Sequence, residues 1–170
     1  MIDWDAYILG ETEQEIAIDS SQDNETAILQ LLNQSQNTLD IFTRDLEPRL
    51  LNTPVFSEAC RRLATLHDRS KIRILVIDPD YVIKHGHRLL DLSRRLTSSI
   101  EIRKAHEDYA RKPESFYIAD GRGWLHRKLA SRYEAMVNFY DPLAAKGMLK
   151  EYNQIWEHSK QYIDFKRLYI

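Results

Sequence analysis

The chain has 170 residues, of which 43% are hydrophobic and 29% charged, a composition typical of soluble globular proteins. Its length favours one domain with a buried core of its own. Five glycines and five prolines are too few for a low-complexity linker, and the single cysteine excludes an intramolecular disulfide and a cysteine-rich metal site. No apolar run approaches the roughly 20 residues of a membrane span.

The net charge of −2 is unevenly distributed along the chain. Residues 1–43 contain nine acidic residues and no Lys or Arg, so residues 44–170 carry 24 basic and 17 acidic ones, a net charge of +7. Such asymmetry is found around anion-binding surfaces, although an ordinary solvated surface with an acidic terminus explains it as well. The acidic N-terminus lacks the basic region of a secretory signal, so we expect a cytoplasmic protein.

Helices and strands are expected to alternate in the first hundred residues, after an N-terminal arm over 1–14. The domain itself is expected to span residues 15–170. Its patterns predict a strand over 15–19, a helix over 24–35, a strand over 38–43, a helix starting at Thr53-Pro54, a strand over 71–77, a helix over 86–96 and a strand over 98–103. The strand over 71–77 is apolar without alternation at its centre, which is typical of strands covered on both faces.

The last third of the chain contains further strand patterns and one long helix. Residues 116–121 end in the turn dipeptide Asp-Gly, residues 124–128 are a candidate paired strand, and residues 134–140 form another strand. Asp141-Pro142 is expected to cap a long amphipathic helix, and the apolar end of the tail, 168–170, is a candidate edge strand. Short connections between alternating elements predict an α/β sandwich with a mixed, largely parallel central sheet flanked by helices.

This arrangement resembles one lobe of the phospholipase D-like superfamily. Members carry the motif H-x-K-x(4)-D at a strand, usually with an Asp-Gly turn, then Gly-Ser-x-Asn, a strand containing Glu and a helix begun by Asp. Asp120-Gly121 matches the motif aspartate with its turn, Asp141-Pro142 the helix start and Ile155-Trp156 the helix end. The resemblance spans about residues 15–160 and implies the same scaffold. Because single-lobe members act as homodimers, it also implies a homodimer.

The motif is degenerate at the positions that carry its chemistry. Counting back from Asp120, Pro113 stands at the position of the nucleophilic histidine and Ser115 at that of the lysine. Proline has no titratable nitrogen, and serine lacks the charge that binds phosphate oxygens. Gly123-Trp124 stands where Gly-Ser is expected. The resemblance therefore implies the scaffold without its active site, and we expect a catalytically inactive module that binds a phosphate-bearing ligand or a partner protein.

His126-x-Lys128 is a second H-x-K pair and leaves an enzymatic alternative open. Side chains two residues apart on a strand point the same way. The seventh residue after His126 is Tyr133, however, and the acid that follows it is Glu134, so the register is shifted by one residue and the acid faces the other side of the strand. His126, Lys128 and Asp120 are nevertheless the catalytic candidates of a phosphodiesterase or nuclease with a displaced site at a homodimer interface.

A basic segment at the start of the helix over 86–96 is a candidate anion site. Lys84, His87 and Arg88 combine cationic side chains with the free backbone N–H groups of a helix start. A polar loop at a helix N-terminus explains the same residues. Two histidines two positions apart, without a third ligand nearby, do not favour a metal site, and we expect neither a metal nor another cofactor.

A second basic cluster lies between residues 103 and 132, where eight Lys or Arg and four acidic residues leave a net charge of +4. Three aromatic residues are interleaved with them. Clustered positive charge binds a phosphate backbone, and aromatic rings stack on unpaired bases. The cluster therefore makes nucleic acid a candidate partner, with ligand-binding candidates Arg111, Lys112, Arg127 and Lys128.

Overall fold

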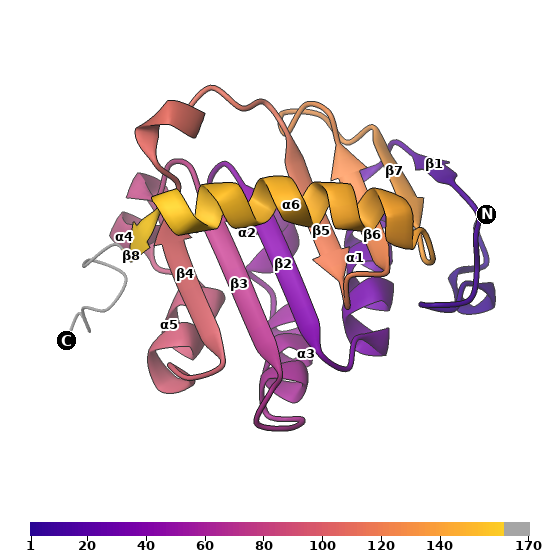
Figure 1. The fold of residues 1–170 in the computed structure, drawn as a ribbon, viewed down its shortest axis with the longest axis horizontal. Coiled ribbons are helices and arrows are strands. Elements are labelled where there is room, and N and C mark those ends of the chain that lie inside the picture. Colours follow the sequence, from indigo (N-terminus) through magenta and orange to yellow (C-terminus); the bar gives the residue numbers. More distant parts are fainter. Residues whose placement is uncertain (162–170) are drawn as a thin grey trace.

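The strands form one eight-stranded sheet in the order β1-β7-β6-β5-β2-β3-β4-β8 (Figure 1). The structure is a computed structural model and describes residues 1–161. The strands are β1 (Ile16–Ile18), β2 (Thr38–Thr43), β3 (Lys71–Val76), β4 (Ile100–Lys104), β5 (Ser115–Ala119), β6 (Gly123–Arg127), β7 (Ala135–Asn138) and β8 (Lys160–Gln161). The helices are η1 (Trp4–Ala6), α1 (Ser21–Gln34), α2 (Pro48–Leu51), α3 (Pro54–Ala64), α4 (Asp80–His85), α5 (Arg88–Arg95), η2 (Glu107–Tyr109) and α6 (Pro142–His158).

The mixed α/β sandwich is confirmed, but the expectation of a largely parallel sheet is wrong. Within the described residues, only β2, β3 and β4 pair in parallel, and every other ladder is antiparallel. Parallel neighbours need a long crossover, which α2 with α3 and α4 with α5 provide in the first two thirds of the chain. From β5 to β7 the connections are short loops without a helix, and such loops join antiparallel strands.

The side chains that begin the predicted helices make the expected hydrogen bonds. The Phe56 N–H donates to Thr53 Oγ1 at the start of α3, and the Ala144 N–H donates to Asp141 Oδ1 at the start of α6, each at 3.1 Å. α1 begins earlier than predicted because Ser20 caps it. The short helices α2 and α4 were not predicted, and the tail over 162–170 lies outside the described residues.

The two faces of the sheet contact separate apolar cores, because neighbours along a strand point to opposite sides. Helices α1, α3 and α5 cover one face, and α6 crosses the other (Figure 1). Ile41 and Tyr117 belong to the core on the side of α1, whereas their neighbours Phe42 and Phe116 belong to the core under α6. The position of a residue along its strand therefore decides which helical layer its side chain contacts.

The N-terminal arm packs against the end of the sheet beside β7. The rings of Trp4 and Tyr7 lie 6.5 Å and 5.7 Å from the ring of Phe139, measured between centroids. The Gly10 N–H donates to the Phe139 carbonyl oxygen at 2.9 Å. The arm is thus docked through Trp4 and Tyr7, whereas Ile8 is 47% exposed.

Asp120 connects the β5–β6 turn to the start of β2. Its φ angle is 53° and that of Gly121 is 64°, as a tight hairpin turn requires. The Asp120 carboxylate accepts hydrogen bonds from the backbone N–H groups of Gln36, Asn37 and Thr38, at 2.8–3.2 Å. The motif aspartate thus has a structural role at the opposite end of β5 from Pro113 and Ser115.

Candidate functional site

The loop between β2 and α2 has a backbone conformation that non-glycine residues rarely adopt. Leu46 and Glu47 have φ angles of 65° and 38°, in the left-handed region. Such a conformation costs about 1–3 kcal/mol per residue, and it clusters at functional sites. The Leu46 N–H donates to Thr43 Oγ1 and the Glu47 N–H to Asp45 Oδ1, each at 3.0 Å. The Leu46 side chain is buried in the core on the α1 side, and this burial fixes the backbone from which the Glu47 side chain extends.

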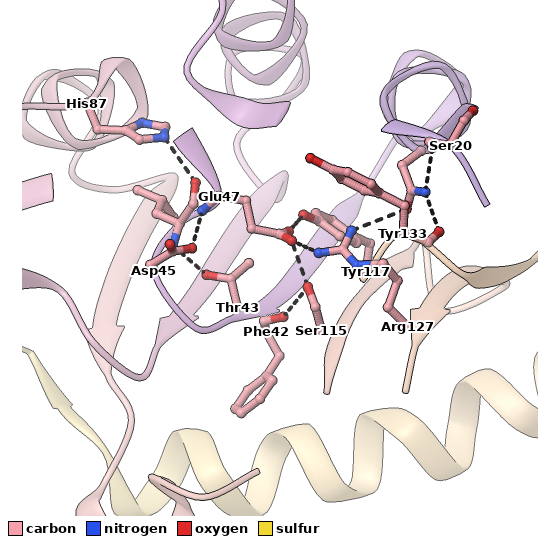
Figure 2. A network of polar contacts seen from close by, with 12 residues as sticks. Ser20, Phe42, Thr43, Asp45, Glu47, His87, Ser115, Tyr117, Arg127 and Tyr133 are labelled. Carbon is pink, nitrogen blue, oxygen red and sulfur yellow. Dashed lines mark hydrogen bonds and ion pairs between the residues drawn. The ribbon is translucent and has the colours of Figure 1, made fainter. Parts of the chain in front are cut away.

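Three donors converge on the carboxylate of Glu47 (Figure 2). The Tyr117 hydroxyl donates to Oε2, the Ser115 hydroxyl donates to the same oxygen at 3.2 Å, and the Arg127 guanidinium forms an ion pair with Oε1. Ser115 and Tyr117 lie two residues apart on β5 and so share a face, and Arg127 pairs with Ser115 in the β5–β6 register. Three strand residues and one loop residue thereby form a single buried polar cluster.

Arg127 is 1% exposed and also contacts α1. Its Nη1 donates to Asn24 Oδ1 at 3.2 Å, and Asn24 in turn donates through Nδ2 to the carbonyl oxygens of Tyr133 and Ser20 at 2.7 Å and 2.9 Å. Burial lowers the pKa of Arg127 to about 10, so the guanidinium stays charged at neutral pH. Burial raises the pKa of Tyr117, which keeps the hydroxyl protonated as a donor.

His87 forms a hydrogen bond with the backbone of the loop between β2 and α2. Its Nδ1 accepts a hydrogen bond from the Leu89 N–H at 3.0 Å and thereby caps α5. The proton must then be on Nε2, which donates to the Leu46 carbonyl oxygen at 3.1 Å. Burial, opposed by this hydrogen bond and by Asp91, lowers the pKa of His87 to about 4. The histidine predicted as a ligand-binding residue is therefore a neutral, buried helix cap.

A cavity of about 660 Å³ opens beside Glu47 at this edge of the sheet. Arg44 and Arg49 are exposed on its rim, and burial raises the pKa of Asp45, which also lines it. Pro113, at the expected position of the nucleophilic histidine, lines the same cavity, while Ser115 beside it is fully buried. The other lining residues are Glu47, Pro48, Leu50, Leu129, Ala130, Ser131 and Tyr133.

His126 and Lys128 meet at a second cavity, of about 540 Å³, beside β1 and β7. His126 lies next to Arg127 on β6, so its side chain points to the α6 side of the sheet, away from Glu47. Its Nε2 lies 2.7 Å from Glu114 Oε2. Although burial alone would raise the pKa of Glu114, its hydrogen bonds with Lys112 and His126 lower it. The two members of the displaced H-x-K pair thus share a cavity, and the histidine has an acidic partner.

The remaining predicted ligand-binding residues are not brought together. Lys84 is exposed on α4, and Arg88 is exposed at the start of α5, where its backbone N–H donates to Asn52 Oδ1 at 3.0 Å. Arg111 is exposed in the loop before β5, and Lys112 forms ion pairs with Glu114 and Glu151. Of the predicted residues, Arg127 makes direct contact with Glu47, and His87 reaches the same loop through Leu46.

Sequence reasoning missed Glu47, Asn24 and the role of Tyr117. One feature of the sequence pointed to Glu47, since it belongs to the polar stretch that follows a buried strand, at the edge where α/β sheets commonly bind ligands. Nothing in the local pattern indicated that Arg127 would pair with it.

Within residues 1–161, no group of three or more His, Cys, Asp or Glu side chains is placed to hold a metal ion. No helix in the same part of the chain is long and apolar enough to cross a membrane.

The family described as "Domain of unknown function (DUF7931)" matches residues 20–168. No curated protein matches the sequence. Among solved structures, the chain is similar to Nuc, a phospholipase D family member from Salmonella typhimurium, with a TM-score of 0.60 and 13% identity over 88% of this chain and 97% of that one. NucT from Helicobacter pylori gives a TM-score of 0.63 and 9% identity over 88% and 99%.

A third similar structure is that of TrmBL2, an archaeal chromatin protein described as showing a novel mode of DNA binding. Its TM-score is 0.62 and its identity 14%, over 88% of this chain and 54% of that one, so the chain spans about half the length of that protein. At these identities the likeness concerns the fold. The predicted phospholipase D-like fold is confirmed.

Proposed function

Because the chain belongs to the DUF7931 family of domains of unknown function and has a phospholipase D-like fold, we propose that it is a catalytically inactive module that binds a phosphate-bearing ligand. The binding region is the cavity beside Glu47, and its rim residues Arg44 and Arg49 contact the ligand. A protein partner carrying a phosphate group belongs to the same ligand class.

The network around Glu47 is the main support for the absence of catalysis. Pro113 and Ser115 occupy the positions at which the superfamily motif has its histidine and lysine, and neither provides a nucleophilic nitrogen or a charge. Ser115 is fully buried and its hydroxyl donates to Glu47. The nearby positive charge, on Arg127, is neutralised by the same carboxylate. In this interpretation the degenerate motif has been replaced by a structural ion pair.

The first prediction concerns phosphodiester hydrolysis. Purified protein is expected to hydrolyse bis(p-nitrophenyl) phosphate no faster than a His126→Ala variant, because His126 is bonded to Glu114 on the other side of the sheet from Ser115. Release of p-nitrophenolate, followed by absorbance, is the measurement. Hydrolysis that is clearly present in the wild-type protein and lost in His126→Ala would instead support the alternative of a displaced site at His126 and Lys128.

The second prediction concerns the rim of the cavity. Among residues 1–161, the hydrogen bonds of Arg44 Nη2 are long, 3.4 Å and 3.5 Å, to the carbonyl oxygens of Ala110 and Lys112, so its charge remains available to a ligand. The Arg44→Ala variant is expected to weaken binding of inorganic phosphate or a phosphorylated probe at least about tenfold, since a hydrogen bond to a charged group contributes about 1.5–3 kcal/mol. Isothermal titration calorimetry measures this change.

Arg69→Ala is the matched control for this titration. Arg69 is also exposed but precedes β3, at the opposite end of the sheet from the cavity. Equal affinities of the wild-type protein and Arg44→Ala, or an equal loss in Arg69→Ala, would refute binding at the rim.

Nucleic acid remains a proposed form of the phosphate-bearing ligand, supported by the basic cluster over 103–132 and by the DNA binding described for the archaeal structural neighbour. If a short single-stranded DNA binds, its affinity is expected to fall steeply with added salt, because binding to a phosphate backbone releases counterions. The homodimer implied by the superfamily likewise remains a prediction, which sedimentation equilibrium would check.

A further inference from the structure

The donors around Glu47 are of the kinds that bind an anion. A guanidinium and two hydroxyl groups converge on one carboxylate: Arg127 on Oε1, and Tyr117 and Ser115 on Oε2. Proteins use these same donor types to bind phosphate and carboxylate groups, and arginine does so with particular geometric fit. All three donors lie on the sheet, where the β5–β6 register positions them without help from the loop (Figure 2).

The acceptor, in contrast, comes from the loop between β2 and α2, and it lies between the donors and the cavity. Glu47 lines the 660 Å³ cavity, together with Arg44 and Arg49, whereas Arg127, Ser115 and Tyr117 do not. An anion that enters the cavity therefore meets the Glu47 side chain before it can reach the three donors. Withdrawal of this one side chain would join the rim and the buried donors into one positively charged site.

The backbone of the loop favours such a withdrawal. Leu46 and Glu47 both have positive φ angles, which are unfavourable for residues other than glycine. The conformation depends on a few contacts, among them the hydrogen bonds of the Leu46 N–H with Thr43 and of the Leu46 carbonyl group with His87. Conformations of this kind persist only where the surroundings over-determine them, and release of one contact lets the loop relax.

We propose that Glu47 is a built-in competitor, whose carboxylate occupies an anion site formed by Arg127, Tyr117 and Ser115 and limits access of a phosphate-bearing ligand to it. The ligand binds tightly when the loop over 45–47 moves Glu47 away and its phosphate group takes the place of the carboxylate. This inference rests on the proposed function, because it assigns a regulatory element to the same binding region.

The Glu47→Gln variant tests the competition directly. It keeps the size of the side chain and removes its charge, so Arg127 is left without a counter-ion and attracts an external anion. Inorganic phosphate is expected to bind this variant at least tenfold more tightly than the wild-type protein, as measured by calorimetry, and to raise its Tm by more. The Glu47→Gln/Arg127→Met double variant is expected to lose that gain. Glu58→Gln, on the exposed face of α3, is the control and should leave phosphate affinity unchanged.

An unchanged phosphate affinity in Glu47→Gln, or a gain that persists in the double variant, would overturn the inference. If Glu47→Gln does not fold, hydrogen–deuterium exchange of the wild-type protein decides: saturating phosphate should increase exchange over residues 44–48, and unchanged or decreased exchange there contradicts the withdrawal of Glu47. Phosphate binding that depends on Arg44 but not on Glu47 would remove this inference and leave the proposed function standing. No binding in any variant would refute both.

Discussion

Replacement of Arg127 by methionine is expected to lower the free energy of unfolding by about 3–5 kcal/mol, the range found when one partner of a buried ion pair is removed. Methionine fills much of the same volume, so the loss comes mainly from electrostatics. The Glu47 carboxylate would remain largely buried without its counter-ion, and Asn24 Oδ1 would lose its donor. Urea unfolding followed by circular dichroism measures the change.

Two further variants separate the ion pair from simple packing. Lys128→Met changes the exposed neighbour of Arg127 and is expected to shift stability by less than about 0.5 kcal/mol. The Glu47→Gln/Arg127→Met double variant removes both charges and is expected to be more stable than Arg127→Met alone. An Arg127→Met protein that unfolds within about 1 kcal/mol of the wild type would show that the pair is not an important part of the folded state.

Acidification between about pH 6.5 and pH 4 is expected to remove about 3 kcal/mol of stability through His87 alone. Its pKa is about 4 in the folded protein, against 6.5 for an unperturbed histidine. Because the folded-state pKa is depressed, the unfolded chain binds a proton in this interval while the folded chain does not. The contribution is thus fully present above pH 6.5 and is lost as the pH falls towards 4.

His87→Asn is the variant that isolates this effect. Asparagine retains a side-chain oxygen that can cap α5 but does not titrate, so stability at pH 7 falls through loss of the hydrogen bond to Leu46. The decline of stability between pH 6.5 and pH 4 should become shallower than in the wild-type protein. Equal slopes for the two proteins, measured by urea unfolding at a series of pH values, would show that His87 is not the group responsible.

Local patterns predicted most helices and strands because their causes are local. Thr53 and Asp141 accept the cap hydrogen bonds that their types suggest, and the predicted strand over 38–43 matches β2 residue for residue. The direction in which strands pair is a different matter, since it depends on whether a connection contains a helix. The loops that join β5 to β6 and β6 to β7 contain none, and the sheet is accordingly mostly antiparallel.

The candidate site was harder to predict because its residues are far apart in the sequence and meet only in the folded chain. Arg127 was selected from the sequence as a ligand-binding candidate in a basic cluster, yet it is buried against α1. Its partner Glu47 lies 80 positions earlier in the chain, on a loop whose left-handed backbone has no signature in the residue types Leu and Glu. His87 was likewise expected at a ligand, and its burial depends on how α5 packs behind the loop.

The strand β1 is synthesised long before β7, the strand with which it pairs. Ile16 lies opposite Val137, so β1 finds its partner only after about 120 further residues have been synthesised. At a synthesis rate of roughly 5–20 residues per second, β1 would wait on the order of ten seconds on the ribosome. During that time α1 and the parallel strands β2, β3 and β4 can assemble, with β1 still unpaired. Only when β7 has been made can β1 pair at the sheet edge, and α6 and β8 are made after both.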